Sequence, residues 1–195
     1  MKDSNEIVVE GGLAVGALID SGRFDIRSVY VEECRHLEIV ARARSAGLPV
    51  TVMAPAEIRK QAGYDFHRGI IAKAARPAME SKGTAWLESA SRLVLPIGLA
   101  DPGNLGTVFR SAAAFGSDAI LVEANRGADI WNRKAIRASA TAVFRLPVIE
   151  LANTLEFLDA AKQAGFEVYG TSLSPRSEPL RGTASVGKSL ILLGA

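Results

Sequence analysis

The chain has 195 residues, of which 48% are hydrophobic and 23% are charged, and 23 Lys and Arg against 21 Asp and Glu give a net charge of +2. This balance is typical of a folded globular protein, and it excludes a disordered chain and a chain with a large net charge of one sign. One cysteine (Cys34) and two histidines exclude an internal disulfide and a zinc site built on these residues. Since the sequence has neither an apolar run of the roughly 18 residues that span a membrane nor a signal-peptide core, we expect a cytoplasmic protein with no membrane partner and no metal.

The first part of the chain alternates strand-like and helix-like segments. Short apolar or β-branched stretches predict strands at 6–10, 27–32, 48–53 and 69–75. Apolar residues at helical spacing predict helices at 12–21, 37–46 and 55–62. Strands separated by helices favour an α/β layer structure over a helical bundle or a sandwich.

Residues 76–92 interrupt this alternation with proline, glycine and several serines around Trp86. We interpret this segment as a linker with about one helical turn. The predicted organisation is a first domain over residues 1–76, a linker over 77–92 and a second domain over 93–195.

The second part of the chain predicts a parallel sheet covered on both faces. Its mostly apolar strands are expected at 93–99, 118–123, 146–151, 166–173 and 189–194. Its helices are expected at 105–116, at 132–144, and up to Ala164 from a capping box of Asn153 and Glu156. Ligands of such sheets bind at the carboxyl ends of the strands, which here are the loop 100–106 and Gly194.

One segment matches the pattern of a nucleotide-binding P-loop. Residues 182–189, GTASVGKS, fit the spacing of that motif, but a functional P-loop follows a strand and opens a helix. Here a polar, proline-containing stretch precedes the motif and a strand-like run follows it. We therefore interpret the segment as a surface loop and do not expect a nucleotide-hydrolysing enzyme.

A second candidate loop runs from Asp101 to Arg110, between a predicted strand and helix. Gly103 and Gly106 permit positive φ or a close backbone approach, and the Asn104 side chain can bond to nearby amides. Arg110 follows Gly106 by one helical turn, where its guanidinium can meet a phosphate. A tight turn, a capped helix and a solvent-exposed arginine explain the same residues.

Two longer stretches carry a family resemblance. LADPGNLGTVFRSAAAFG at 99–116 and NRKAIRASATAVFRLPV at 132–148 resemble the first conserved region of the SpoU-type, TrmH-like RNA 2′-O-ribose methyltransferases. These belong to the SPOUT superfamily of knotted enzymes that use S-adenosylmethionine. Residues 6–75 resemble the small RNA-binding domain that often precedes this catalytic domain, whose fold certain ribosomal proteins share.

The resemblance implies a reaction and a role for several residues. It implies transfer of a methyl group from S-adenosylmethionine to a ribose 2′-hydroxyl of rRNA or tRNA by a homodimer, without a metal. Arg110 would be the catalytic arginine, Asn104 would shape the loop, and Gly106 would let RNA or a helix approach. Because a guanidinium keeps its proton in proteins, we expect Arg110 to position a phosphate and stabilise a developing alkoxide rather than accept a proton.

Basic residues suggest where RNA would bind. Residues 126–145 contain five Lys and Arg against one Asp, a local net charge of +4, and include the candidates Arg133, Lys134 and Arg137. In the first domain, Arg68 follows Tyr64 and Phe66 and is a further candidate. A solvated helix face and a packed turn are the alternatives. Thr141 departs from the family, in which glycine is usual at this point.

The resemblance also implies that the second and third conserved regions and the knot follow Gly194, beyond the 195 residues. The expected fold is thus a small α/β RNA-binding domain plus an incomplete SPOUT-type domain without its C-terminal knot. Of the cofactor site, Gly194 and Thr171 would remain. Three hypotheses follow: part of an active methyltransferase, a relative that binds RNA without catalysis, or a site completed by another chain.

Overall fold

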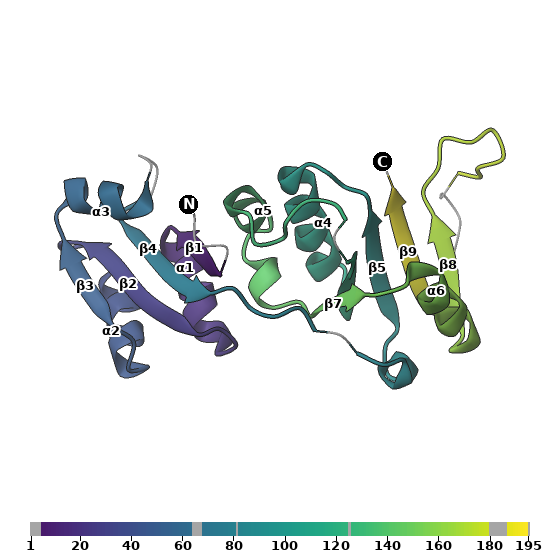
Figure 1. Cartoon of the computed structure of the whole chain (residues 1–195), viewed down its shortest axis with the longest axis horizontal. Coiled ribbons are helices and arrows are strands. Elements are labelled where there is room, and N and C mark those ends of the chain that lie inside the picture. The colour runs from purple at the N-terminus through teal and green to yellow at the C-terminus, as the bar shows by residue number, and fades with distance from the viewer. Residues whose placement is uncertain (1–4, 64–67, 81, 125, 180–186, 195) are drawn as a thin grey trace.

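The computed structural model describes residues 5–63, 68–80, 82–124, 126–179 and 187–194. They form two β-sheets that lie side by side, each with its own helices (Figure 1). We refer to residues up to β4 as the N-terminal unit and to residues from β5 onward as the C-terminal unit. Among the described residues, no helix combines the length and apolar character needed to traverse a membrane.

The N-terminal unit is built on a four-stranded mixed sheet with the order β1-β4-β2-β3. Its strands are β1 (Glu6–Glu10), β2 (Ile26–Glu32), β3 (Val50–Met53) and β4 (Ile70–Ala75). Strand β4 is antiparallel to β1 and β2, whereas β2 and β3 are parallel. The helices are α1 (Gly12–Ser21), α2 (Leu37–Ser45) and α3 (Pro55–Ala62), which confirms the predicted alternation.

The C-terminal unit is built on a five-stranded, entirely parallel sheet with the order β7-β6-β5-β9-β8. Its strands are β5 (Arg92–Ile97), β6 (Ala119–Glu123), β7 (Val148–Leu151), β8 (Phe166–Gly170) and β9 (Lys188–Gly194). Its helices are α4 (Pro102–Ala114), α5 (Arg133–Ala138) and α6 (Thr154–Gln163), with the short 3-10 helices η1 (Ala85–Glu88) and η2 (Ala142–Phe144). The helical turn expected in the linker is η1.

Alternate residues of the parallel strands enter two separate cores, as expected for a sheet covered on both faces. Val94 packs with Phe109 of α4 on one face, whereas Leu95 packs with Phe157 of α6 on the other. The chain runs from β5 to β6 and β7 on one side, and returns to place β9 and β8 on the other. The order of the strands therefore reverses between β5 and β9, and this reversal is where open α/β sheets bind ligands.

Two predicted helix boundaries are wrong. Helix α4 begins at Pro102 rather than at 105, because Asp101 caps it and proline is accepted in a first turn. The helix expected at 132–144 is divided into α5 and η2 by Ala140 and Thr141, whose φ angles are 47° and 77°. Such positive angles end an α-helix, and a β-branched residue rarely adopts them.

The two units share a continuous core. The ring of Phe24, from the N-terminal unit, meets Trp131 and Phe144 edge to face, with centroid distances of 5.5 Å to each. Trp131 is only 7% exposed, so it acts in packing. At the border of this core, Arg76 donates two hydrogen bonds of 2.9 and 2.7 Å to Asp129. These contacts hold η2 and the segment that precedes α5 against the first unit.

Candidate functional site

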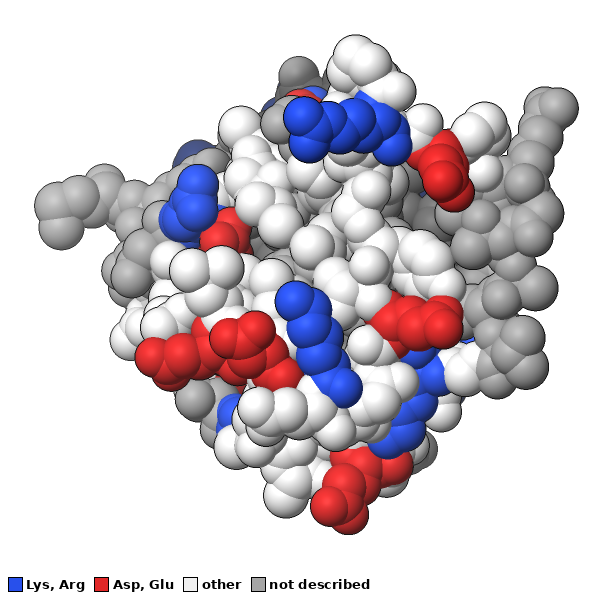
Figure 2. Space-filling view, turned by 90° about the vertical axis from the view of Figure 1, so that its right-hand side faces the viewer, with Lys and Arg blue, Asp and Glu red and all other residues white. Residues whose placement is uncertain are grey.

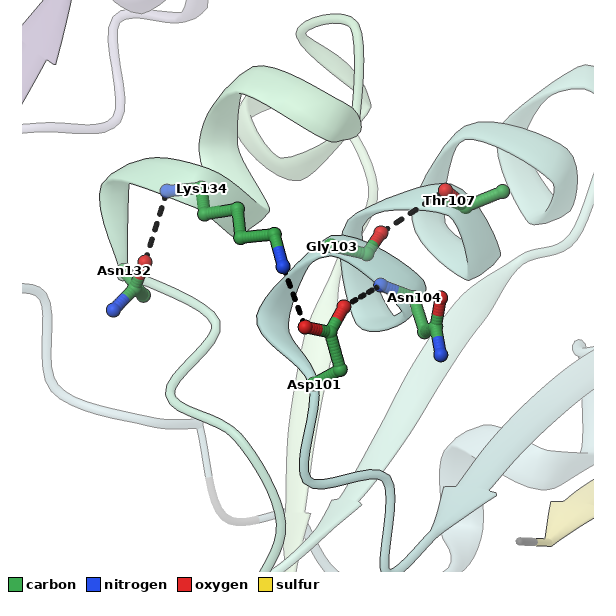
Figure 3. A network of polar contacts seen from close by, with 6 residues as sticks. All are labelled: Asp101, Gly103, Asn104, Thr107, Asn132 and Lys134. Carbon is green, nitrogen blue, oxygen red and sulfur yellow. Dashed lines mark hydrogen bonds and ion pairs between the residues drawn. The ribbon is translucent and has the colours of Figure 1, made fainter.

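The start of α4 is held by a network of charges and caps (Figure 3). The Oδ1 atom of Asp101 accepts a hydrogen bond of 2.8 Å from the backbone N–H of Asn104, and Oδ2 accepts one of 2.5 Å from the ammonium of Lys134. Lys134 belongs to α5, whose own cap is Asn132. The Lys134 ammonium and the Asn104 amide lower the pKa of the Asp101 carboxyl. One ion pair thereby joins the first turns of both helices.

Asp101, rather than Asn104, shapes this turn. Within the described part of the chain, the Asn104 carboxamide makes no hydrogen bond, and in Figure 3 it extends away from Lys134. Sequence reasoning missed the role of Asp101, although an Asp directly before a first-turn proline is a recognisable cap. The exposed carboxamide of Asn104 is thus available to a ligand.

The two glycines of α4 allow a close helix contact. A β-carbon on Gly106 would lie 2.3 Å from the Ala135 carbonyl oxygen, and one on Gly103 would lie 2.8 Å from Cε of Lys134. Both residues are helical and neither has a positive φ. The expectation of a close backbone approach is therefore confirmed at Gly106, which α5 approaches, whereas the atoms near Gly103 belong to the side chains of Asp101 and Lys134.

Arg110 lies one turn beyond Gly106 on α4 and is exposed. Among the residues that the structure describes, its guanidinium has no carboxylate or carbonyl partner. Most other described arginines of the C-terminal unit donate side-chain hydrogen bonds to carbonyl, carboxylate or hydroxyl oxygens of the protein. They are Arg92, Arg126, Arg133 and Arg145. Arg110 is thus a cation that the described fold leaves available.

Gly194 and Thr171 lie near each other at the carboxyl edge of the parallel sheet. Gly194 is aligned with Ile97 across the β5–β9 pair, at the reversal of strand order. Thr171 directly follows β8, and both its N–H and its hydroxyl donate to the carbonyl of Leu192, at 3.0 and 3.2 Å. A β-carbon on Gly194 would meet nothing within 4 Å, so the described residues form one open wall here and do not enclose a ligand.

The structure brings all four basic candidates to the seam between the two units. Arg133 and Lys134 line a cavity of about 580 Å³ between β1 and α5, and Arg137 lines it too. Arg137 and Arg133 also line an adjoining cavity of about 70 Å³, where Arg68 arrives from the N-terminal unit. Arg133 is paired with Glu10 at 3.0 Å and Lys134 with Asp101, so the local charge of +4 is partly neutralised by distant acids.

The structure describes the last three residues of the P-loop-like segment, 187–189. Residues 182–186 lie outside the described residues, but Lys188 and Ser189 belong to strand β9 and open no helix. The Lys188 ammonium donates to the carbonyl oxygens of Leu87 and Glu88, at 2.7 and 2.9 Å, and lies 5.3 Å from the centre of the Phe166 ring. Its role is to close η1 against the sheet.

Figure 2 shows the face at the β8 end of the molecule. Basic and acidic side chains are interspersed on it around a largely uncharged area. A surface that binds the negatively charged RNA backbone needs a positive electrostatic potential over its whole area. In the described part of the chain, the convergence of basic residues at the seam is therefore the stronger candidate for such a surface.

Comparisons with known proteins agree with this arrangement. Residues 91–195 match the SpoU rRNA Methylase family, and residues 8–79 match the family described as RNA 2′-O ribose methyltransferase substrate binding. The chain belongs to the SpoU rRNA methylase family. The two matched regions coincide with the two sheets.

Individual relatives extend this result. The 23S rRNA (guanosine-2′-O-)-methyltransferase RlmB of Xanthomonas axonopodis is 30% identical over 179 residues, which cover 87% of this chain and 71% of that protein. An rRNA methyltransferase from Sinorhizobium meliloti has the same fold, with a TM-score of 0.77 at 22% identity over 98% of this chain and 71% of that one. The SpoU methyltransferase AviRb from Streptomyces viridochromogenes, solved with AdoMet, gives a TM-score of 0.74 at 22% identity over 98% and 74% of the two chains.

Proposed function

We propose that this SpoU-family chain transfers a methyl group from S-adenosylmethionine to a ribose 2′-hydroxyl of rRNA. The observation that carries the proposal is the exposed guanidinium of Arg110, which has no acidic partner among the described residues and lies on the helix that starts at the ligand-binding edge of the parallel sheet. Family membership and the 23S rRNA relative support ribosomal RNA as the substrate, with tRNA as the second class to test.

The chemistry requires a stronger nucleophile than a neutral ribose hydroxyl. When bound, the cofactor supplies an electrophilic methyl group on sulfur. Arg110 would hold the phosphate next to the target ribose and stabilise the negative charge that develops on the 2′-oxygen. Its permanent charge suits this role and not that of a base, so the proton leaves to another acceptor. The scheme uses no metal.

Further residues complete the proposed site. Asn104, exposed beside Asp101, would contact the RNA at the start of α4. Gly194 and Thr171 would form the cofactor wall, since both lie at the carboxyl ends of parallel strands and a β-carbon on Gly194 meets nothing within 4 Å. Arg68, Arg133, Lys134 and Arg137 would contribute to RNA binding from the seam between the units.

A second candidate function is RNA binding without catalysis. The basic residues that line the cavities between the units favour it, because they attract an RNA backbone whether or not a cofactor is bound. Titration calorimetry with S-adenosylmethionine, alongside transfer of a labelled methyl group to purified rRNA and tRNA, separates the two. Micromolar cofactor binding and methylation that Arg110→Ala abolishes would exclude the binding-only function. RNA binding without any cofactor affinity would exclude the enzyme.

Matched variants sharpen this test. Arg44→Ala removes the same charge from an exposed position of α2, in the N-terminal unit, and should leave methyl transfer unchanged. Arg110→Lys keeps the charge but loses the two-pronged geometry, so we expect it to restore only part of the activity. We expect a cytoplasmic homodimer. Light scattering on the purified chain measures its mass in solution and so tests whether it is a dimer.

A further inference from the structure

We propose that Arg68 and Arg137 together clamp one backbone phosphate of the RNA in the small cavity between the two units. This inference rests on the proposed function for its substrate, and it divides the four basic candidates into two groups. Arg68 and Arg137 would contact the phosphate. Arg133 and Lys134 would be positioning residues, each acting through an acidic partner.

The balance of charge around the cavity favours an anion. Its charged lining residues in the described part of the chain are Glu10, Arg68, Arg133 and Arg137. Glu10 is 10% exposed and accepts from Arg133 at 3.0 Å, so its charge is already compensated. Arg68 and Arg137 have no carboxylate partner among the described residues. Two cations that face one cavity repel each other unless an anion lies between them.

The size of the cavity restricts the ligand to a compact group. Its volume of about 70 Å³ is far smaller than the roughly 300 Å³ or more of a typical small-molecule pocket. It exceeds the roughly 15 Å³ that a water molecule needs, so a compact group enters it and a nucleoside does not. A phosphate with two guanidinium groups on opposite sides satisfies both the volume and the charge, and guanidinium geometry matches phosphate oxygens.

The backbone presents Arg68 to the cavity in an unusual conformation. This residue has a φ of 55°, and its carbonyl accepts a hydrogen bond of 2.8 Å from Nε2 of His36. Gly11, which has no β-carbon, leaves room beside the Arg68 side chain, since a β-carbon there would lie 3.2 Å from Cδ. A positive φ is unfavourable for a non-glycine residue, and here the conformation brings Arg68 to the cavity.

The α5 side of the cavity is equally constrained. Ala140 and Thr141 line it and both have positive φ angles. Arg137 precedes them on α5, which is fixed against the first unit by the Arg133–Glu10 pair and against α4 by the Lys134–Asp101 pair. The two arginines, 69 positions apart in sequence, thus come from two units whose relative position is set by other contacts.

The proposal can be tested by binding of the full chain to a fluorescein-labelled, single-stranded RNA 20-mer of mixed sequence at several salt concentrations. We expect Arg68→Ala and Arg137→Ala each to weaken binding by roughly tenfold. The logarithm of the association constant falls as the logarithm of the salt concentration rises. In the double variant this slope should become less steep by about 0.7, the value for one phosphate on a single strand. A drop of about 1.4, twice that value, would mean two separate phosphates and would overturn the clamp.

Controls separate the clamp from the proposed function. Arg44→Ala should leave both affinity and slope unchanged, and far-ultraviolet circular dichroism checks that every variant is folded. A peptide nucleic acid of the same sequence, which has no phosphates, should bind weakly and be insensitive to either arginine variant. Unchanged RNA affinity in both variants, with methyl transfer intact, would overturn the clamp alone. Clamp-dependent RNA binding without methyl transfer would overturn the enzyme alone, and wild-type protein that binds no RNA would overturn both.

Discussion

A β-carbon on Gly106 would lie 2.3 Å from the carbonyl oxygen of Ala135, so α4 rests directly on the backbone of α5. The atom that a larger residue would meet is main chain and cannot rotate away. Gly106→Ala should therefore lower the free energy of unfolding by about 2 kcal/mol, although alanine is the better helix former. Thermal unfolding of Gly106→Ala against Gly83→Ala, where a β-carbon meets nothing within 4 Å, tests this. Equal melting temperatures for the two variants would contradict it.

At position 141, glycine should give a more stable protein than alanine, which is the reverse of their usual order in a helix. Its φ of 77° suits glycine, and its hydroxyl accepts a hydrogen bond of 2.6 Å from Arg145. Both Thr141→Ala and Thr141→Gly lose that bond, so their difference isolates the backbone conformation. We expect Thr141→Gly to be the more stable of the two by about 1 kcal/mol, as measured by urea unfolding. A more stable alanine variant would show that the positive φ costs nothing.

The Asp101 carboxyl should contribute to acid sensitivity. The Lys134 ammonium, and then the Asn104 amide, lower its pKa in the folded chain below the usual value. A lowered folded pKa means that the stabilisation is present above about pH 4 and is lost as the pH falls through the folded pKa. Asp101→Asn should thus flatten the fall in melting temperature below about pH 4. Asp159→Asn, on the exposed side of α6, is the control, and an identical acid limb in Asp101→Asn and wild type would refute the prediction.

The aromatic contact between the units should matter more than the ion pair beside it. Phe24 meets two rings, whereas Arg76 and Asp129 are 38% and 42% exposed and are screened by solvent. Phe24→Ala should cost about 3 kcal/mol and Arg76→Ala about 1 kcal/mol or less. Raising the salt to about 1 M should reduce only the second effect. The opposite ranking in chemical denaturation would assign the interface to electrostatics.

Lys188 should act in folding and not in nucleotide binding. Its ammonium bonds to two carbonyl oxygens of η1, so Lys188→Met leaves those acceptors without their donor. We expect a drop of roughly 3 °C in melting temperature. We also expect no heat on titrating Mg-ATP into either the wild type or the variant. Binding of Mg-ATP that disappears in Lys188→Met would restore the P-loop interpretation.

Local patterns predicted most of the elements. Strand β1 and helices α1 and α3 have the predicted limits, since alternation, helical spacing and capping act over a few neighbouring residues. The predicted boundaries are wrong at Pro102 and at Thr141, for different reasons. An Asp–Pro–Gly stretch is typical of both a turn and a helix start. The positive φ of Thr141 is imposed by the packing of η2, whose three residues are buried.

The sequence by itself determined the α/β class, the family and the identity of the basic candidates, because these depend on residue type and spacing along the chain. Only the tertiary structure decided which charges compensate each other. Glu10 and Arg133 are 123 positions apart, and Asp101 and Lys134 are 33 apart, so no local pattern reveals either pair. The net charge of +2 describes the whole chain, but the field at the seam depends on which acids the fold brings to which arginines. Charge interactions decay over ångströms of space and not over positions in sequence.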